Sequence, residues 1–347
     1  MSTEGISSRQ FLAWKDDELE VAARCLACGE SYLVPVHDDL EDLLGSLPGR
    51  WGFLACSKCS SLHLSPRPTL AAIGKAYPAD YVTHGDAGQS HARDNGISII
   101  WQLCNGYLNS RFSANRQPAL QVGAWLVPWL WPIRQQLDYF YRHMPARSGR
   151  LLDVGCGNGA FLLRARAAGW QVQGIEPDPG AAEVARRQNL EVRNCDIGTF
   201  SPEVTFDWIT LSHVFEHLHS PRESLQRMHG WLRPGGGLWM ALPNPTGVGH
   251  RVFGRNWFSL DPPRHVFLPP QAQVVAMLEA AGYVDVHVLR RGRGSHSSVL
   301  PSVDYSRRRR GRMRFGGAGL TLLIDALGSL ASRFSEETVV VARRGVD

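Results

Sequence analysis

Short apolar runs alternate with stretches of helical periodicity through the second half of the chain. Leu151–Val154 and Val172–Ile175 are apolar runs of strand length, and Ala160–Ala168 between them repeats apolar positions at helical spacing. A strand, a helix and a second strand in this order predict a βαβ unit, the building block of a parallel sheet. The pattern therefore predicts an α/β fold that begins near residue 148.

The same alternation continues towards the C-terminus. Helical periodicity predicts helices over residues 180–188, 221–231 and 271–281. Leu232–Gly237 contains a proline and three glycines and predicts a turn before the next strand. Runs rich in apolar and β-branched residues predict further strands at Phe206–Leu211, Leu238–Leu242, Tyr283–Leu289 and Thr338–Ala342.

The first half of the chain is organised differently. Residues 1–20 read as a lead-in and residues 21–65 carry four cysteines in two pairs. Residues 66–147 begin rich in Pro, Gly and Tyr, become helical and aromatic, and predict a linker or lid. Residues 148–347 form the nucleotide-binding fold, interrupted by an arginine-rich insertion over 290–334 that is far longer than an ordinary loop.

A glycine-rich turn follows the first predicted strand of the α/β region. Gly155, Gly157 and Gly159 let the backbone approach a ligand closely, and Asp153 precedes them at the strand end. Glu176 ends the next strand, where a carboxylate can accept hydrogen bonds from two ribose hydroxyls. Its distance from Gly155 is close to the roughly 20 positions of a dinucleotide-binding fingerprint, so this unit by itself also fits NAD.

The order of the later segments resembles class I S-adenosylmethionine (SAM)-dependent methyltransferases. Leu151–Asp178 is similar to their motif I, residues 194–197 (NCDI) to the adenine-binding turn, and residues 213–217 (HVFEH) to the segment after the fourth strand. The resemblance spans about 145 to 345. It is greatest to bacterial methyltransferases of glycan and surface-polysaccharide clusters.

The resemblance implies a fold, a cofactor and its contacts. The fold is a Rossmann-like, seven-stranded class I methyltransferase sheet with helices on both faces, whose last two strands form an antiparallel edge. The cofactor is SAM, and Asp153 would help hold its amino group. The implied cofactor-binding residues are Asp153, Gly155, Cys156, Gly157, Gly159, Glu176, Asp196, Ile197 and His213.

The paired cysteines predict a metal site. Cys25 and Cys28 form one C-x2-C pair, and Cys56 and Cys59 form a second. Four thiolates in two such pairs suit one tetrahedral Zn²⁺, and a site with four cysteine ligands leaves no open position, so we expect a structural, zinc-ribbon-like module. Related methyltransferases carry a similar module followed by P-R-P and Y-P-x-x-Y, as at residues 66–68 and 77–81 here, which suggests a substrate-side lid.

The composition is that of an ordinary globular protein. Hydrophobic residues make up 44% and charged residues 20%. The polar, acidic N-terminus does not resemble a secretion signal, and seven cysteines then favour a reducing compartment, so we expect a cytoplasmic protein. Cys104, Cys156 and Cys195 lie outside the two pairs, and Cys156 and Cys195 are expected to pack rather than react.

Two segments suggest partners. The insertion concentrates arginines that could contact nucleic acid, anionic lipid or a phosphorylated substrate, or simply be solvated: Arg290, Arg291, Arg293, Arg307, Arg308, Arg309, Arg310, Arg312 and Arg314. Leu320–Leu330 inside it has helical periodicity. Residues 119–133 carry three tryptophans and are too short to cross a bilayer, so they fit a packed helix, a dimer face or contact with a membrane interface.

Methyl transfer from a sulfonium is an in-line displacement that needs alignment and, for a hydroxyl acceptor, a base. His213, Glu216 and His217 follow the fourth strand at the edge where such sheets bind ligands. His265 lies in a D-P-P-R-H-V-F stretch that resembles the segment over the acceptor pocket of related enzymes, and Arg264 beside it could hold a phosphate or carboxylate. His265, His217 and His213 are therefore the predicted catalytic residues.

Together these features predict a SAM-dependent methyltransferase. The expected acceptor is a sugar, glycan or related small metabolite, free or lipid-linked, methylated at oxygen, by a protein that is cytoplasmic or peripheral to the inner membrane. An RNA methyltransferase that grips phosphates with the zinc module and the arginines is an alternative, although no base-reading motif is recognisable. A SAM-binding scaffold without catalysis is another.

Overall fold

The structure is a computed structural model, and it describes residues 14–44, 47–77, 98–310 and 317–346. The first part of the lead-in, residues 78–81 of the Y-P-x-x-Y stretch, Arg312 and Arg314 lie outside these ranges. No helix within these ranges is long and apolar enough to cross a membrane.

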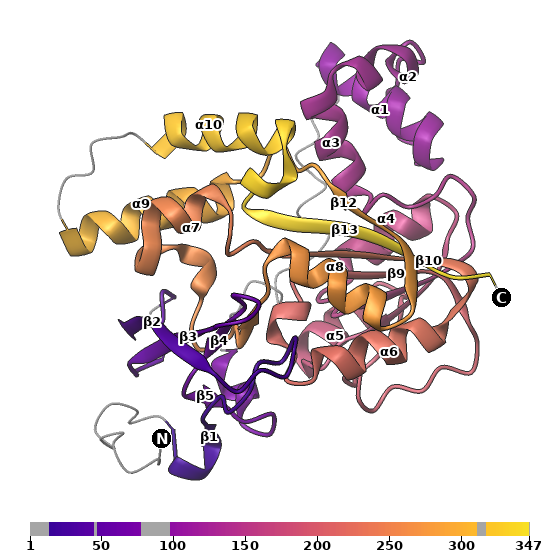
Figure 1. Cartoon of the computed structure of the whole chain (residues 1–347). Coiled ribbons are helices and arrows are strands. Elements are labelled where there is room, and N and C mark those ends of the chain that lie inside the picture. The colour runs from indigo at the N-terminus through magenta and orange to yellow at the C-terminus, as the bar shows by residue number, and fades with distance from the viewer. Residues whose placement is uncertain (1–13, 45–46, 78–97, 311–316, 347) are drawn as a thin grey trace.

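A seven-stranded mixed sheet forms the centre of the molecule (Figure 1). The strand order is β12-β13-β10-β9-β6-β7-β8, with five parallel strands and an antiparallel edge made by β13 and β12. The predicted Rossmann-like methyltransferase sheet is confirmed. The strands are β6 (Arg150–Val154), β7 (Gln171–Ile175), β8 (Glu191–Arg193), β9 (Phe206–Ser212), β10 (Leu232–Pro243), β12 (Tyr283–Leu289) and β13 (Glu337–Arg344).

Helices cover both faces of this sheet because its strands are apolar on both sides. Leu151 of β6 packs with the helices that precede and follow it, whereas its neighbour Leu152 packs in a separate core on the opposite face. The first face carries α1 (Ile99–Phe112), α3 (Trp131–Phe140), α4 (Ala160–Ala167) and α5 (Pro179–Arg187), and the second carries α6 (Pro221–Trp231) and α8 (Gln271–Ala280).

The strand order reverses beside β6, and this places two strand ends together. β6 pairs with β7 on one side and with β9 on the other, so the chain leaves these strands in different directions. Ligands bind at such a switch point, outside the carboxyl ends of the parallel strands. The glycine turn after β6 and the segment after β9 therefore face the same crevice.

A second sheet joins the cysteine region to the methyltransferase-like part. Its order is β11-β4-β3-β2, where β2 (Leu33–Leu40), β3 (Trp51–Cys56) and β4 (Leu62–Leu64) come from the N-terminal region. The edge strand β11 (Phe267–Leu268) comes from much later in the chain and directly follows the segment that contains His265. The short pair β1 (Leu19–Glu20) and β5 (Arg67–Pro68) closes the base of this region.

The arginine-rich insertion contains two helices, α9 (His296–Arg310) and α10 (Gly317–Leu330). Val299 and Val303 of α9 and Ile324 of α10 pack in one core with Trp51 and Phe53 of β3, and α7 (Val248–Phe253) adds Phe253. The predicted helix at Leu320–Leu330 is present and begins slightly earlier. The insertion is thus packed onto the N-terminal sheet, while Arg307 and Arg308 stay exposed.

Two sequence expectations differ in detail from the fold. Leu232–Gly237 was expected to form a turn, but β10 already pairs with β9 at Leu232 and resumes at Gly237 after an irregular stretch. Of the tryptophans in residues 119–133, Trp125 lies in α2 (Gly123–Leu126), Trp129 in the turn after it and Trp131 at the start of α3, and Trp125 and Trp129 are 79% and 83% exposed. They do not form a helix packed over the cofactor crevice.

Candidate active site

The glycine turn after β6 has the shape that only glycine adopts without strain. Gly155, Gly157 and Gly159 have φ angles of +66°, +53° and +81°. A Cβ on Gly155 would lie 2.5 Å from Val214 Cγ2, in the segment after β9. The turn therefore needs glycine for its left-handed backbone and for its close approach to the neighbouring strand end.

Glu176 holds this turn from the end of β7. Its Oε2 accepts a hydrogen bond of 2.8 Å from the Gly157 amide, and its Oε1 accepts one of 3.0 Å from the Asp178 amide. Burial raises the pKa of Glu176, and the two amide donors oppose that rise. Each carboxylate oxygen retains a second lone pair, so Glu176 can still accept from ribose hydroxyls.

Asp153 lies beneath the turn and is fully buried. Its Oδ1 accepts hydrogen bonds from the Arg142 guanidinium and from the Thr210 hydroxyl, the latter at 2.8 Å. Its Oδ2 is buried without a hydrogen-bond partner among the described residues. Burial raises the pKa of Asp153, and Arg142 opposes that rise. An orphaned carboxylate oxygen at this place is suited to a cationic amino group.

The predicted adenine turn follows β8. Asp196 Oδ1 accepts from the Thr199 amide at 2.8 Å and the Thr199 hydroxyl at 2.9 Å, which shapes the turn. The Ile197 side chain is buried in the core, so it can offer a ligand only its backbone. Cys156 Sγ points at Gly174, where a Cβ would lie 2.6 Å from it, and burial raises the pKa of this thiol. Cys156 is a packing residue in this geometry.

His213, at the end of β9, is held between two carboxylates. Its Nδ1 lies 3.3 Å from Glu216 Oε1 and its Nε2 lies 3.2 Å from Glu337 Oε1. Burial opposes ionisation, yet these two carboxylates raise the pKa of His213 well above its ordinary value. These contacts favour the protonated imidazole over the neutral one. Its side chain is 41% exposed, so solvent screens part of this attraction.

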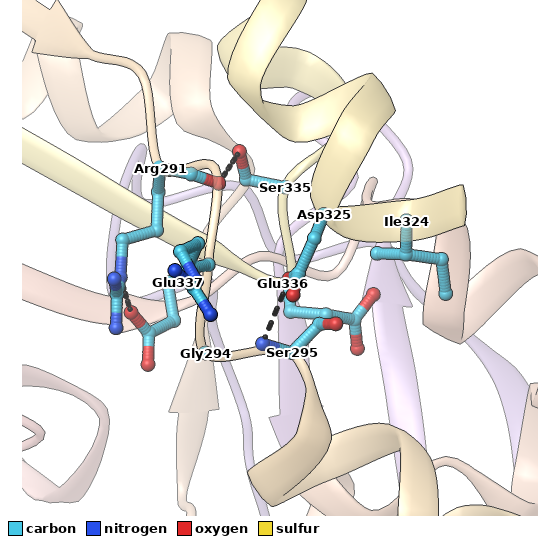
Figure 2. A pocket seen from close by; sticks show the side chains of 9 residues that line it. Arg291, Gly294, Ser295, Ile324, Asp325, Ser335, Glu336 and Glu337 are labelled. Atoms are coloured by element: carbon cyan, nitrogen blue, oxygen red, sulfur yellow. Dashed lines mark hydrogen bonds and ion pairs between the residues drawn. The ribbon is translucent and has the colours of Figure 1, made fainter. Parts of the chain in front are cut away.

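Glu337, at the start of β13, links His213 to Arg291 of the insertion. Arg291 Nε donates to Glu337 Oε2 at 3.0 Å, as Figure 2 shows, and the guanidinium also lies 3.5 Å from the centre of the Tyr139 ring. Burial raises the pKa of Glu337, but His213 and Arg291 outweigh it and lower that pKa to about 2. The first buried arginine of the insertion thus fixes the carboxylate that positions His213.

His217 and His265 also lie close to Glu216, the residue that contacts His213. The rings of His217 and His265 are in edge contact, with centroids 4.8 Å apart. His265 Nε2 lies 3.8 Å from Glu216 Oε1, and the Tyr77 hydroxyl lies 3.0 Å from His217 Nδ1. The structure therefore brings together predicted residues from two distant segments, and adds Tyr77 from the N-terminal region.

Arg264 has a different role from the one the sequence suggested. Its side chain is fully buried and forms ion pairs with Asp42 and Asp261, and its Nη1 donates to the Ala76 carbonyl at 3.2 Å. A guanidinium with these partners cannot also grip a substrate phosphate. Arg264 instead ties the N-terminal region to the segment that carries His265.

The four paired cysteines converge on one point beside α8. The sulfur atoms of Cys25 and Cys59 lie 3.5 Å apart, those of Cys28 and Cys56 lie 3.6 Å apart, and those of Cys28 and Cys59 lie 3.7 Å apart. A Zn–S bond of about 2.3 Å gives a tetrahedron with S–S edges of about 3.8 Å. Hydrogen bonding by Cys25 and Ser61 lowers the pKa of Cys59, which favours a thiolate there.

The comparisons with known proteins agree with this geometry. Residues 133–288 match a family profile described as a methyltransferase domain. This segment is similar to methyltransferase domains, and it spans just under half of the chain. It contains the glycine turn, Glu176, and the Glu216, His217 and His265 cluster.

The domain is similar to curated O-methyltransferases. It is 32% identical over 123 residues to the ubiquinone biosynthesis O-methyltransferase of Xanthomonas oryzae pv. oryzae (strain PXO99A), covering 33% of this chain and 51% of that protein. The corresponding protein of Xanthomonas euvesicatoria pv. vesicatoria (strain 85-10) is 28% identical over 166 residues, covering 44% of this chain and 68% of that protein. The chain spans about half the length of the first of these relatives.

Among solved structures, the chain is similar to an S-adenosylmethionine dependent methyltransferase from Mesorhizobium loti. The TM-score is 0.44 at 17% identity, over 60% of this chain and 98% of that one.

Several residues of the site were not singled out from the sequence. Arg142 follows an aromatic run and carries no motif, and Thr210 is an interior position of a strand. Glu337 could have been suspected, because an acidic pair directly before an apolar strand is unusual, and one of its members must be paired or exposed. Tyr77 belongs to the Y-P-x-x-Y stretch, and nothing in the sequence around it indicates that it meets His217.

Proposed function

We propose that this chain is a SAM-dependent methyltransferase that transfers a methyl group to a hydroxyl oxygen of a sugar, glycan or related small metabolite. One observation carries the proposal. The glycine turn, Glu176 and the Glu216–His217 segment follow β6, β7 and β9 at the same edge of the sheet, and His265 meets Glu216 there from the loop before β11. A cofactor held by the first group would present its reactive end to the second.

The residues of the cofactor side suit SAM. The orphaned Oδ2 of Asp153 can accept from the ammonium of the methionine portion, and the free lone pairs of Glu176 can accept from the ribose hydroxyls. The carboxylate of Asp196 lies after β8, where the adenine would rest. SAM, when bound, supplies a methyl group activated on a sulfonium.

The acceptor side supplies alignment and removal of a proton. Glu216, His217 and His265 offer lone pairs to a hydroxyl, and His213 is charged and orients Glu216 rather than taking a proton. The names of the curated relatives, O-methyltransferases of ubiquinone biosynthesis, favour oxygen over nitrogen or carbon. The sugar or glycan acceptor rests on the sequence resemblance.

The N-terminal region is proposed to be a structural zinc module that closes the acceptor side. Its four sulfurs already stand at nearly the separations of a ZnS₄ tetrahedron. Its strand β4 pairs with β11, and Tyr77 reaches His217 from the same region. A metal that rigidifies this module would therefore act on the acceptor side without touching the cofactor.

A peripheral membrane contact is proposed for the exposed apolar surface of α1 and α2. We call this the tryptophan surface, and it comprises Ile99, Ile100, Trp101, Val122, Trp125, Leu126, Trp129 and Leu130. Tryptophan is favoured at membrane interfaces. Figure 1 shows α1 and α2 at the edge of the molecule away from the N-terminal sheet, where a bilayer could meet them. This contact would suit a lipid-linked acceptor.

The test is transfer of label from methyl-tritiated SAM into fractionated extract of the source cells. Gly157→Arg is the blank, because a long side chain on a left-handed turn would block the cofactor, and the exposed Glu203→Gln is the matched control. Label in a sugar, polysaccharide or lipid-linked fraction is the expected result. Label in RNA would replace this proposal by the RNA methyltransferase alternative, and absence of label with intact SAM binding would leave the scaffold.

A further inference from the structure

The Glu216, His217 and His265 cluster has the arrangement of a metal site. One ligand atom from each residue can be chosen so that all three lie within 4.8 Å of one another. The three come from two separate segments, the 3-10 turn Phe215–His217 after β9 and the loop before β11. The fold, not the local sequence, creates this convergence.

The hydrogen bonds fix which nitrogen of each imidazole is free. His217 Nδ1 lies 2.9 Å from the Arg264 carbonyl, and His265 Nδ1 lies 2.8 Å from the Ser259 carbonyl. A carbonyl only accepts, so each Nδ1 must carry the hydrogen, and each neutral ring then keeps a lone pair on Nε2. A backbone carbonyl that fixes the tautomer in this way is the usual support of a metal-binding histidine.

Glu216 is electron-rich and poorly compensated. Its side chain is fully buried, and neither of its oxygens accepts a hydrogen bond within the described part of the chain. Among the described residues, the nearest ion-pair partner is His213, whose Nδ1 lies 3.3 Å from Oε1. The Nε2 atom of His265 stands 3.8 Å from the same carboxylate, too far for a direct hydrogen bond and close enough for both to bind one cation.

We propose that Glu216, His217 and His265 bind one divalent first-row transition-metal ion. Two imidazoles and one carboxylate suit Mn²⁺, Fe²⁺ or Zn²⁺ and leave coordination positions open, unlike the closed set of four cysteines. Bond lengths of about 2.1 Å require the ligand atoms to draw together by about an ångström from their present separations. His213 Nδ1, 3.3 Å from Glu216 Oε1, also contacts this carboxylate.

The catalytic consequence of this ion rests on the proposed function, whereas its binding does not. With these three side chains bound to the metal, the acceptor hydroxyl would take an open position on it, which lowers the pKa of that hydroxyl, and the proton would pass to water instead of directly to the side chains. The oxygen would then form a bond to the methyl carbon while the carbon–sulfur bond breaks. The electron pair of that bond stays on sulfur, which gives S-adenosylhomocysteine and the methyl ether.

The experiment is a titration of the zinc-loaded full chain with Mn²⁺, followed by electron paramagnetic resonance of the free ion. Total metal analysis separates this site from the cysteine cluster. Wild type is expected to bind one Mn²⁺ per chain, and Glu216→Gln and His265→Gln are each expected to weaken it about tenfold or more. His287→Gln is the matched control, because His287 is an exposed histidine on the edge strand β12.

The outcomes separate this site from the proposed function. The site is overturned if wild type binds no ion beyond the cysteine cluster when offered Mn²⁺, Fe²⁺ or Zn²⁺, or if both variants bind it as wild type does. Because a buried variant can misfold, circular dichroism and SAM calorimetry accompany each titration. Metal binding without any methyl transfer would uphold the site and count against the proposed function, and full transfer by metal-stripped protein would overturn the catalytic role of the ion.

Discussion

The two sides of the crevice handle their buried carboxylates in opposite ways. On the cofactor side, Glu176 accepts hydrogen bonds from two backbone amides of its own βαβ unit. On the acceptor side, Glu216 is more deeply buried and accepts none from the described residues. Backbone amides satisfy the carboxylate of Glu176, whereas side chains and a bound group must satisfy that of Glu216. The cofactor side is thus pre-formed, and the acceptor side is built to be finished by its ligands.

The largest expected effect breaks the cofactor side alone. Glu176→Ala removes the acceptor of the Gly157 and Asp178 amides together with the ribose contact. Loss of charged hydrogen bonds with two amides left unpaired should cost about 3 kcal/mol, so SAM affinity measured by calorimetry should fall roughly 100-fold. Metal uptake at Glu216 should persist. Unchanged SAM affinity in the folded variant would contradict this assignment.

The second largest effect is expected from a substitution in the cysteine cluster, which should disturb the acceptor side without touching it. Cys56→Ser should abolish zinc binding by the cysteine cluster and loosen β4, which carries β11 and so the His265 segment. Methyl transfer should fall by about tenfold or more while SAM affinity stays within about twofold. Cys104→Ser is the matched control, since Cys104 lies in the core of the other sheet face. A parallel loss of SAM affinity would show that the two sides are not separable.

A smaller effect comes from a single hydroxyl. Tyr77→Phe removes the oxygen that lies 3.0 Å from His217 Nδ1. Loss of one such hydrogen bond corresponds to about 1 kcal/mol, so we expect a roughly fivefold lower rate of methyl transfer. Steady-state kinetics with the affinity for SAM measured alongside would check this. Recovery of the rate would not be expected from any increase in SAM concentration.

The smallest effect concerns acid. His63, on β4, is fully buried with no hydrogen-bond partner at either ring nitrogen in the described ranges, and burial lowers its pKa to about 3. Below the ordinary pKa of 6.5, His63 takes up a proton in the unfolded chain but stays neutral in the folded chain. The free energy of unfolding therefore falls as the pH drops from about 6.5 towards 3. His63 can change the free energy of unfolding by at most about 1.4 kcal/mol per pH unit.

His63→Leu should remove that slope and raise stability at pH 5.5 by about 1 kcal/mol, because it also removes unpaired polar atoms. Hydrogen exchange of the β4 and β11 amides at pH 7.5 and 5.5 is the measurement. Acid should open these strands before β6 and β7 in wild type and not in the variant. Equal acid sensitivity in both proteins would rule out His63 as the cause.

The same contrast explains how far the sequence could be interpreted. The strand, turn and helix after Leu151 were predictable because each is stabilised by its own neighbours: apolar periodicity, glycines at left-handed positions, and Glu176 facing Gly157. By contrast, α9 could not be predicted from local sequence, because Pro301 and the run of arginines do not favour a helix. Packing against β3 stabilises this helix instead.

The acceptor side depends on pairs that are far apart in sequence. The sequence suggested that Arg264 binds substrate, because its ion-pair partner Asp42 lies 222 positions away and is not apparent from local sequence. Tyr77 and His217 are separated by 140 positions, and the pairing of β11 with β4 joins Phe267 to His63 across an even longer stretch of chain. Local patterns carry no record of such contacts, so sequence could name His217 and His265 as candidates but could not place them together.

The most direct test of this account is single-turnover methyl transfer from bound labelled SAM by Glu216→Gln, with its SAM affinity measured on the same sample. If the cofactor side is pre-formed and the acceptor side depends on Glu216, SAM affinity will stay within about twofold of wild type while the transfer rate falls about 100-fold or more. Transfer at the wild-type rate, or an equal loss of SAM affinity and rate, would contradict it.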